Sequence, residues 1–252
     1  MWHQLILAVS FLTIIRLPFT PSQEATPSDL AGSFSWFPLV GLVLGLCATA
    51  PAYLFPAAPP LMLAVLVAAL LAFLTRGLHL DGLADVADGF GGGYTRERRL
   101  EIMKDSRTGP LGALALIFAV LFKVAALHTL ISAHCWTSML LAPVLSRLAM
   151  VLSAYRMPHA RKAGGLATPF LEAMTFHQVV LAVLLSAAIL VCFDLKFAAL
   201  SLGIVAWCAM LARILAQRWL GGMTGDVLGA LNEVAEVAVL TVAAGYFAGH
   251  AG

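Results

Sequence analysis

Residues 60–88 read PLMLAVLVAALLAFLTRGLHLDGLADVAD, an apolar run that changes abruptly into a segment with three aspartates. The apolar part, Pro60 to Thr75, carries no charged residue, which is typical of a helix in a bilayer. Asp81, Asp85 and Asp88 follow at i, i+4 and i+7, so a helix with 3.6 residues per turn projects them from one face. The junction predicts a membrane helix that leads into an acidic surface.

The composition of the whole chain supports a membrane location. Of its 252 residues, 61% are hydrophobic and only 11% are charged, and the mean hydropathy is +0.94. Soluble domains are roughly half apolar and a quarter charged, so the sequence predicts an integral membrane protein. The net charge of +2 gives no indication of a nucleic-acid partner. The cysteines lack C-x-x-C spacing and are interpreted as packing residues: Cys47, Cys135, Cys192 and Cys208.

Hydropathy predicts an all-α fold, a polytopic membrane helical bundle of about 7 transmembrane helices (6 to 8) within a single domain, residues 1–252. The N-terminal stretch, Met1 to Phe19, is apolar but contains Arg16, so it is left open whether it spans, re-enters or lies at the interface. The predicted spans are Phe34 to Phe55, Pro60 to Thr75, Leu111 to Ser132, Thr137 to Tyr155, Gln178 to Asp194, Phe197 to Leu220 and Glu233 to His250.

The basic residues orient these spans. They gather in the loop region 77–110, in the loop after Tyr155 and after the sixth span, whereas the connections near Ala57, His134 and Lys196 hold few. If the spans alternate, all three basic loops lie on one side, which the positive-inside rule makes cytoplasmic. The acids of the loop regions fall on that same side. The pattern favours a one-sided catalytic surface over a transport path.

The aspartate triplet has two interpretations. Asp81, Asp85 and Asp88 repel one another unless a cation lies among them, and Mg²⁺ prefers carboxylate and phosphate oxygens. The triplet therefore predicts a metal-bridged phosphate or diphosphate site, with all three aspartates as Mg²⁺ ligands. The alternative is a solvated helix face without a ligand.

The region that follows adds donors for phosphate oxygens. Lys104, Asp105, Ser106 and Arg107 are consecutive and lie between a short predicted helix and the third span. Lysine, arginine and a hydroxyl can bind the oxygens of a diphosphate that metal ions leave free, and Asp105 can act as a general base. The alternative is a basic loop that only sets the topology.

A second acidic site is predicted at Gly221-Gly222-Met223-Thr224-Gly225-Asp226. Thr224 and Asp226 can cap the last helix, because an acid is favoured near a helix N-terminus. They can also serve a substrate, with Thr224 as a binding residue and Asp226 as a catalytic carboxylate. The functional interpretation is the one we favour for Asp226.

Two cations lie inside predicted spans. Lys123 and Arg147 are each near the centre of an apolar run, where an unpaired charge costs about 3 kcal/mol on insertion scales. Each therefore needs a polar cavity or a carboxylate. They are candidates for binding an anionic substrate group, and pairing with Asp88 or Glu236 is the structural alternative. His79 is a minor candidate for a ligand or a proton-transfer group.

Three motifs in order, HLDGLADVADG at 79–89, EIMKDSRTG at 101–109 and GGMTGD at 221–226, strongly resemble the cobalamin synthase family of adenosylcobinamide-GDP ribazoletransferases. The resemblance covers nearly the whole chain. The CDP-alcohol phosphotransferases match only in part, since Ala84-Asp85 stands where their motif has Ala-Arg. An enzyme of that kind acting on another diphosphate-linked substrate is the alternative function.

The resemblance implies a Mg²⁺-dependent transfer in late cobalamin biosynthesis. Adenosylcobinamide-GDP would react with α-ribazole, or its 5′-phosphate, to give adenosylcobalamin, or its 5′-phosphate, and GMP. One of Asp85, Asp105 and Asp226 would be the general base, and Lys104 and Arg107 would steady the leaving GMP. A transporter is a weaker alternative because we see no internal repeat. An assembly protein would not explain the aspartates. Association with itself or with a biosynthetic complex is left open.

Overall fold

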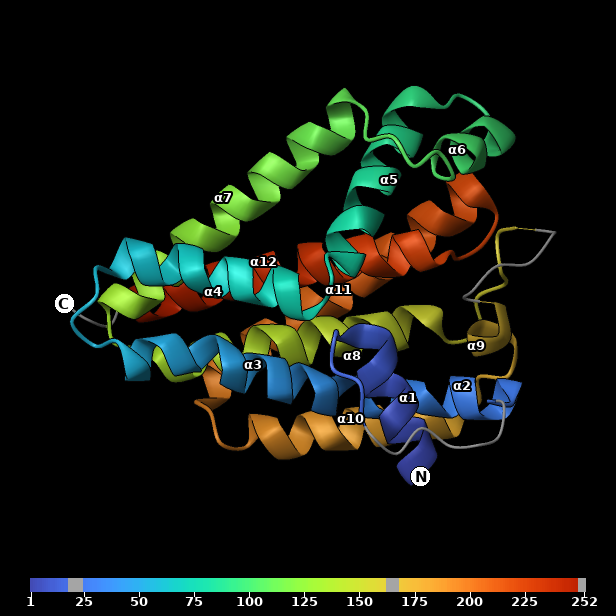
Figure 1. Cartoon of the computed structure of the whole chain (residues 1–252). Coiled ribbons are helices and arrows are strands. Elements are labelled where there is room, and N and C mark those ends of the chain that lie inside the picture. Colours follow the sequence, from blue (N-terminus) through green and yellow to red (C-terminus); the bar gives the residue numbers. More distant parts are fainter. Residues whose placement is uncertain (18–24, 162–167, 249–252) are drawn as a thin grey trace.

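The computed structural model describes residues 1–17, 25–161 and 168–248, and every regular element in these ranges is a helix (Figure 1). The all-α fold is therefore confirmed. The elements are α1 Trp2–Leu12, α2 Pro27–Ser33, η1 Phe34–Trp36, α3 Phe37–Leu54, α4 Pro60–Leu74, α5 Leu78–Gly92, α6 Arg96–Ile102, α7 Pro110–Ser132, η2 Trp136–Leu140, α8 Leu141–Ala154, α9 Thr168–Glu172, α10 Phe176–Leu190, α11 Leu195–Leu220 and α12 Gly225–Ala248.

Five helical segments of the described chain are long and apolar enough to cross a membrane. They are Pro27–Leu54, Pro110–Ser132, Trp136–Ala154, Leu195–Leu220 and Gly225–Phe247. The helices α4 and α5 make a sixth span only if they are counted together as one span that is broken by an 89° bend. The structure thus gives five or six spans where about seven (6 to 8) were expected, because the predicted span Gln178 to Asp194 is the 15-residue helix α10. The N-terminal stretch, which was left open, forms α1 with only 11 residues. A helix rises 1.5 Å per residue, so neither crosses about 30 Å of hydrocarbon alone.

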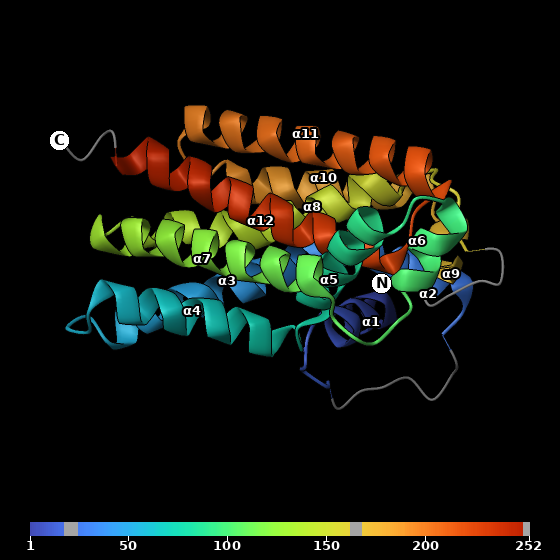
Figure 2. The same ribbon diagram turned by 90° about the horizontal axis from the view of Figure 1, so that it is seen from above.

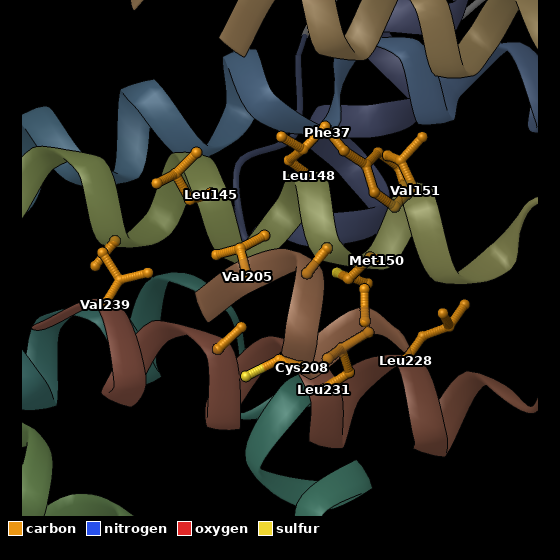
Figure 3. Close-up of a cluster of buried hydrophobic side chains, with 14 of the residues drawn as sticks. Phe37, Leu145, Leu148, Met150, Val151, Val205, Cys208, Leu228, Leu231 and Val239 are labelled. Atoms are coloured by element: carbon orange, nitrogen blue, oxygen red, sulfur yellow. The ribbon is translucent and has the colours of Figure 1, made fainter. Parts of the chain in front are cut away.

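The bundle has a central helix and an apolar outer surface. In the span that contains α8, 83% of the residues are buried, whereas only 28% are buried in α7 and in α11. Figure 3 shows Leu145 and Leu148 of α8 on the side of the helix that faces Phe37 of α3, and Val205, Cys208 and Val239 of α11 and α12 on its other side. The outer helices α7 and α11 instead expose large apolar side chains, among them Phe118, Phe122, Trp207 and Met210. A contiguous surface of this kind suits lipid rather than water.

A sharp turn separates α4 from α5. Arg76 and Gly77 both have positive φ values, 54° and 66°, and the chain bends by 89° there. α5 consequently runs across the bundle, while α7, α8, α11 and α12 run side by side (Figures 1 and 2). We take α4 as inserted in the membrane, although with 15 residues it is, like α10, too short to cross it alone, and α5 as a helix lying outside the spans. The region 77–110, expected as a cytoplasmic-side loop region, is thus mostly helical, with α6 following α5.

One end of the bundle collects the polar connections. α6, α9 and the turn between α11 and α12 lie together at one end in Figure 1, and the C-terminus lies at the other. We call the first of these the basic end, defined by residues 96–107, 156–161 and 218–226, which hold most arginines of the loops. The expected one-sided distribution of charge is confirmed for the described residues.

Candidate active site

The site begins at the crossing of α5 and α12, which two glycines allow to be very close. A Cβ at Gly82 would lie 2.7 Å from the carbonyl oxygen of Asp226, and a Cβ at Gly229 would lie 3.3 Å from the Cα of His79. Real Cβ atoms do not approach backbone to 2.7 Å, so a larger residue at Gly82 would force the helices apart. The crossing brings Asp81 and Asp85 beside the N-terminus of α12.

Asp85 has the most strongly perturbed environment among these carboxylates. Its partial burial, together with the charges of Asp81 and Asp226, raises the pKa of Asp85 to about 7, against the opposing effect of Arg161. Desolvation and like charges both disfavour an ionised carboxylate. Asp81, Asp85 and Asp226, which belong to two acidic motifs in the sequence, therefore share one environment in the structure.

Asp226 is fixed by its helix and by an arginine. The hydroxyl of Thr224 accepts a hydrogen bond from the backbone N–H of Val227 at 3.2 Å, so Thr224 caps α12 as the structural interpretation expected. Arg161 Nη2 lies 2.7 Å from Asp226 Oδ2. Arg161 is a residue that the sequence analysis missed. The only feature of the sequence that indicated a role for Arg161 was its position in a basic loop.

Backbone pairing holds Arg161 next to the GGMTGD segment. The N–H of Met223 donates to the carbonyl oxygen of Pro158 at 2.8 Å, and that of Ala160 donates to Met223 at 2.9 Å. Gly222 is required here, because a Cβ would overlap the Pro158 carbonyl oxygen. Arg96 Nη2 also donates to the Ala160 carbonyl at 2.7 Å. The GGMTGD segment and residues 158–161 thus form one unit.

Asp88 faces another part of the structure. Its Oδ2 accepts the Gly109 N–H at 2.7 Å and its Oδ1 accepts the Gly112 N–H at 2.8 Å, both at the start of α7. An acid at a helix N-terminus is favoured by the unpaired N–H groups and the dipole. Asp88 therefore joins α5 to α7. Each of its oxygens retains a second lone pair, so a metal ligand role stays a prediction.

The other candidates of the 104–107 segment lie at the surface. Lys104, Ser106 and Arg107 are exposed, and Arg107 Nη2 pairs with Asp105 Oδ2 at 2.6 Å. Hydrogen bonds from Arg107 lower the pKa of Asp105 to about 2. A carboxyl group with this pKa is a weak base, so Asp105 is a poorer candidate for proton abstraction than Asp85 or Asp226.

The two membrane cations belong to a buried ion network. Lys123 Nζ lies 2.8 Å from both Glu233 Oε2 and Glu236 Oε1, and Arg147 Nη1 lies 2.6 Å from Glu236 Oε2. All four residues are buried. Two cations thus face two anions. The structural alternative, in which Lys123 and Arg147 pair with Glu236, is the arrangement that the structure has. Substrate binding by Lys123 and Arg147 stays a prediction, and because both cations are paired with carboxylates, neither has an unpaired charge to offer a substrate.

The acidic site contains no ready-made metal cage. Among the residues that the structure describes, no three His, Cys, Asp or Glu side chains are gathered closely enough to hold an ion by themselves. Mg²⁺ commonly takes only one or two protein carboxylates and completes its shell with water and substrate phosphate. Asp81 and Asp85 beside Asp226 fit that simpler requirement. The crowding that raises the pKa of Asp85 is the condition that a bound cation relieves.

Apolar outer helices and an acidic site at one end define a polytopic membrane protein whose polar site lies at one face. The chain belongs to the cobalamin-5-phosphate synthase family, whose sequence profile matches residues 4–244. A protein from Syntrophobacter fumaroxidans named adenosylcobinamide-GDP ribazoletransferase is 56% identical over 245 residues, which cover 97% of this chain and 99% of that one.

More distant relatives carry the same name. The proteins from Chlorobaculum parvum and Desulforamulus reducens are each 42% identical, over 251 and 246 residues respectively. These matches cover 95% of this chain in both cases, and 94% and 95% of the relatives. No solved structure matches the chain. The family expected from the three motifs is confirmed.

Proposed function

We propose that this protein transfers the cobinamide phosphate of adenosylcobinamide-GDP to α-ribazole or its 5′-phosphate, releasing GMP. The names of its relatives support the substrates. The single structural observation that carries the site assignment is the α5–α12 crossing, which brings Asp81, Asp85 and Asp226 together at the basic end. We place this end on the cytoplasmic side of a bacterial cytoplasmic membrane, because basic loops stay inside.

The reaction forms one bond and breaks one. A ribose hydroxyl oxygen of ribazole attacks the phosphorus next to cobinamide, and the bond from that phosphorus to the GMP phosphate breaks. The hydroxyl proton must go to a base, and the leaving oxygen gains negative charge. Positioning and charge neutralisation therefore account for most of the catalysis.

The protein groups divide between these tasks. Asp226, or Asp85 when it is not bound to a metal ion, takes the hydroxyl proton, since both lie at the crossing. Within the described residues, Arg161 uses one N–H group for Asp226, and other N–H groups of its guanidinium can donate to phosphate oxygens. Lys104 and Arg107, exposed on the same end, can approach the outer GMP phosphate. Binding energy from each of these contacts holds the two substrates in line.

The proposed cofactor is Mg²⁺, held by Asp81 and Asp85 with Asp226 beside them. Bound there, it would neutralise the diphosphate charge. Asp88 is tied to α7 and would contribute less directly. Self-association or binding to other biosynthetic enzymes remains a prediction on which the proposed reaction does not depend.

The test uses the full chain in detergent or lipid discs with adenosylcobinamide-GDP, ribazole and Mg²⁺. We expect GMP release only when all three are present, and losses of at least about 100-fold for Asp81→Asn and Asp85→Asn, which remove charge-stabilising ligands. Glu97→Gln, an exposed acid on α6, is the matched control and should retain activity. Normal Mg²⁺-dependent GMP release by the two aspartate variants would refute the site assignment.

A further inference from the structure

A partly open cavity of about 170 Å³ lies at the basic end, between the N-terminal helices and the α5–α12 crossing. One wall is aromatic and comes from α1, η1, α3 and α9, with Phe11, Phe34, Phe37 and Phe170. The opposite wall is polar and includes His79, Asp81, Arg161 and Asp226. A single cavity therefore joins an apolar surface to the acidic site.

The aromatic wall is built from rings in mutual contact. The centroids of Phe34 and Phe37 are 4.5 Å apart, and those of Phe11 and Phe170 are 5.0 Å apart. Phe34 and Phe37 are buried, whereas Phe11 is only partly buried. Such ring clusters offer flat and edge surfaces to another aromatic ring. An apolar cavity of about 150 Å³ holds a benzene molecule, so the space here has the dimensions of an aromatic group that can extend through the open side.

His79 provides a second, independent indication of a ligand. The residue is 1% exposed and belongs to the lining of the cavity, and neither ring nitrogen has a hydrogen-bond partner in the described part of the chain. Buried polar groups are nearly always hydrogen-bonded, and exceptions call for an explanation. Neither nitrogen is exposed in this structure, so the His79 ring must turn toward the cavity for a polar atom of a ligand to satisfy one of them.

We propose that this cavity is the subsite for the ribazole base, with the dimethylated benzimidazole ring against Phe11 and Phe170 and its polar side toward His79. This inference rests on the proposed function. The benzimidazole edge carries two methyl groups and no donors, which suits the aromatic wall. The attached ribose then points toward Asp81 and Asp226, where the hydroxyl must react.

The guanine of the other substrate fits this wall less well. Guanine presents donors and acceptors around most of its edge, and burying these against phenylalanines without partners is unfavourable. Its phosphates also place it on the leaving side of the reaction, which we assign to Arg107 and Lys104. The ribazole base is therefore the occupant that both walls favour.

The experiment compares kinetic constants for the two substrates separately. Phe11→Leu and Phe170→Leu should each raise the KM for ribazole about ten-fold, within the range found when base stacking is lost. The KM for adenosylcobinamide-GDP should stay within about two-fold. Phe118→Leu, on the lipid-facing side of α7 with 56% exposure, is the matched control.

His79 is tested with two variants. His79→Gln retains a donor and an acceptor, whereas His79→Leu has neither, so His79→Leu should weaken ribazole binding more than His79→Gln. Direct binding of labelled ribazole to the full chain, without the other substrate, is measured for every variant. This measurement does not require turnover.

The outcomes separate the subsite from the function. If the wild type turns over but the phenylalanine variants change only the KM for adenosylcobinamide-GDP, the cavity belongs to guanine and the inference is overturned. Equal effects on both substrates would also overturn it. If ribazole binds, the variants weaken that binding and no GMP is released, the subsite stands and the proposed transfer fails.

Discussion

Gly82 of α5 lies directly against the backbone of Asp226 of α12, and a Cβ at Gly82 would come within 2.7 Å of the Asp226 carbonyl oxygen. This contact joins the first acidic motif to the second, although the two residues are far apart in the sequence. Only glycine permits this separation of the helix axes. The acidic site therefore depends on a residue that has no side chain of its own.

Gly82→Ala should consequently reduce both activity and stability. Overpacking of a close contact costs about 1–3 kcal/mol, and a shift of about 1 Å in catalytic groups can cost about 100-fold in rate. Thermal unfolding in detergent and GMP release measure the two effects. Gly203→Ala on α11 is the control, since a Cβ there meets nothing within 4 Å. An active, stable Gly82→Ala protein would contradict the close crossing.

Asp88 allows a prediction that separates a helix cap from a metal ligand. Asp88→Ala removes the acceptor for two N–H groups at the start of α7, so we expect a loss of about 1–2 kcal/mol in the free energy of unfolding. Asp85→Asn should leave stability nearly unchanged while activity falls. Thermal melts and Mg²⁺ titrations of turnover, run on both variants, make the comparison. If Asp88→Ala changes only the Mg²⁺ requirement, the capping role is secondary.

The fold was largely predictable because lipid-facing helices must be apolar along their whole length. The boundaries of α7 and α11 agree with the expected spans to within a few residues. The number of spans was not predictable, because hydropathy does not show that α4 ends in an 89° bend or that α10 stops after 15 residues. Local backbone conformation at Arg76 and Gly77 decides the bend.

The site was predictable only in part, because the sequence shows local spacing but not contacts between distant residues. Helical spacing indicated that the aspartates share a face, but it could not show that Asp88 binds the start of α7. Arg161 meets Asp226 across 65 residues of sequence, and such contacts leave no local pattern. For Lys123 and Arg147, the cost of an unpaired charge correctly required carboxylate partners, and Glu236 was one of the alternatives.

The buried ion network gives a prediction about Lys123. Lys123→Met leaves Glu233 without its cation, and breaking a buried pair in this way costs about 3–5 kcal/mol. The double variant Lys123→Met with Glu233→Gln removes one charge of each sign and keeps the Arg147–Glu236 pair, so stability and turnover should both recover. Folded-protein yield and GMP release measure this. A stable but inactive double variant would instead support substrate binding by Lys123.

Arg161 should have a larger effect on catalysis than on stability. Its contact with Asp226 is partly exposed, so Arg161→Gln should cost less than about 1 kcal/mol in stability. If Arg161 both positions Asp226 and donates to phosphate, kcat/KM should fall about 10- to 100-fold, because a hydrogen bond between charged groups is worth about 1.5–3 kcal/mol. Arg161→Lys retains the charge and should recover part of the loss.

Arg98→Gln breaks the exposed pair with Glu101 at the same end of the bundle and is the control. Equal kcat/KM for Arg161→Gln and Arg98→Gln would exclude Arg161 from the site, since both variants remove one arginine from the basic end.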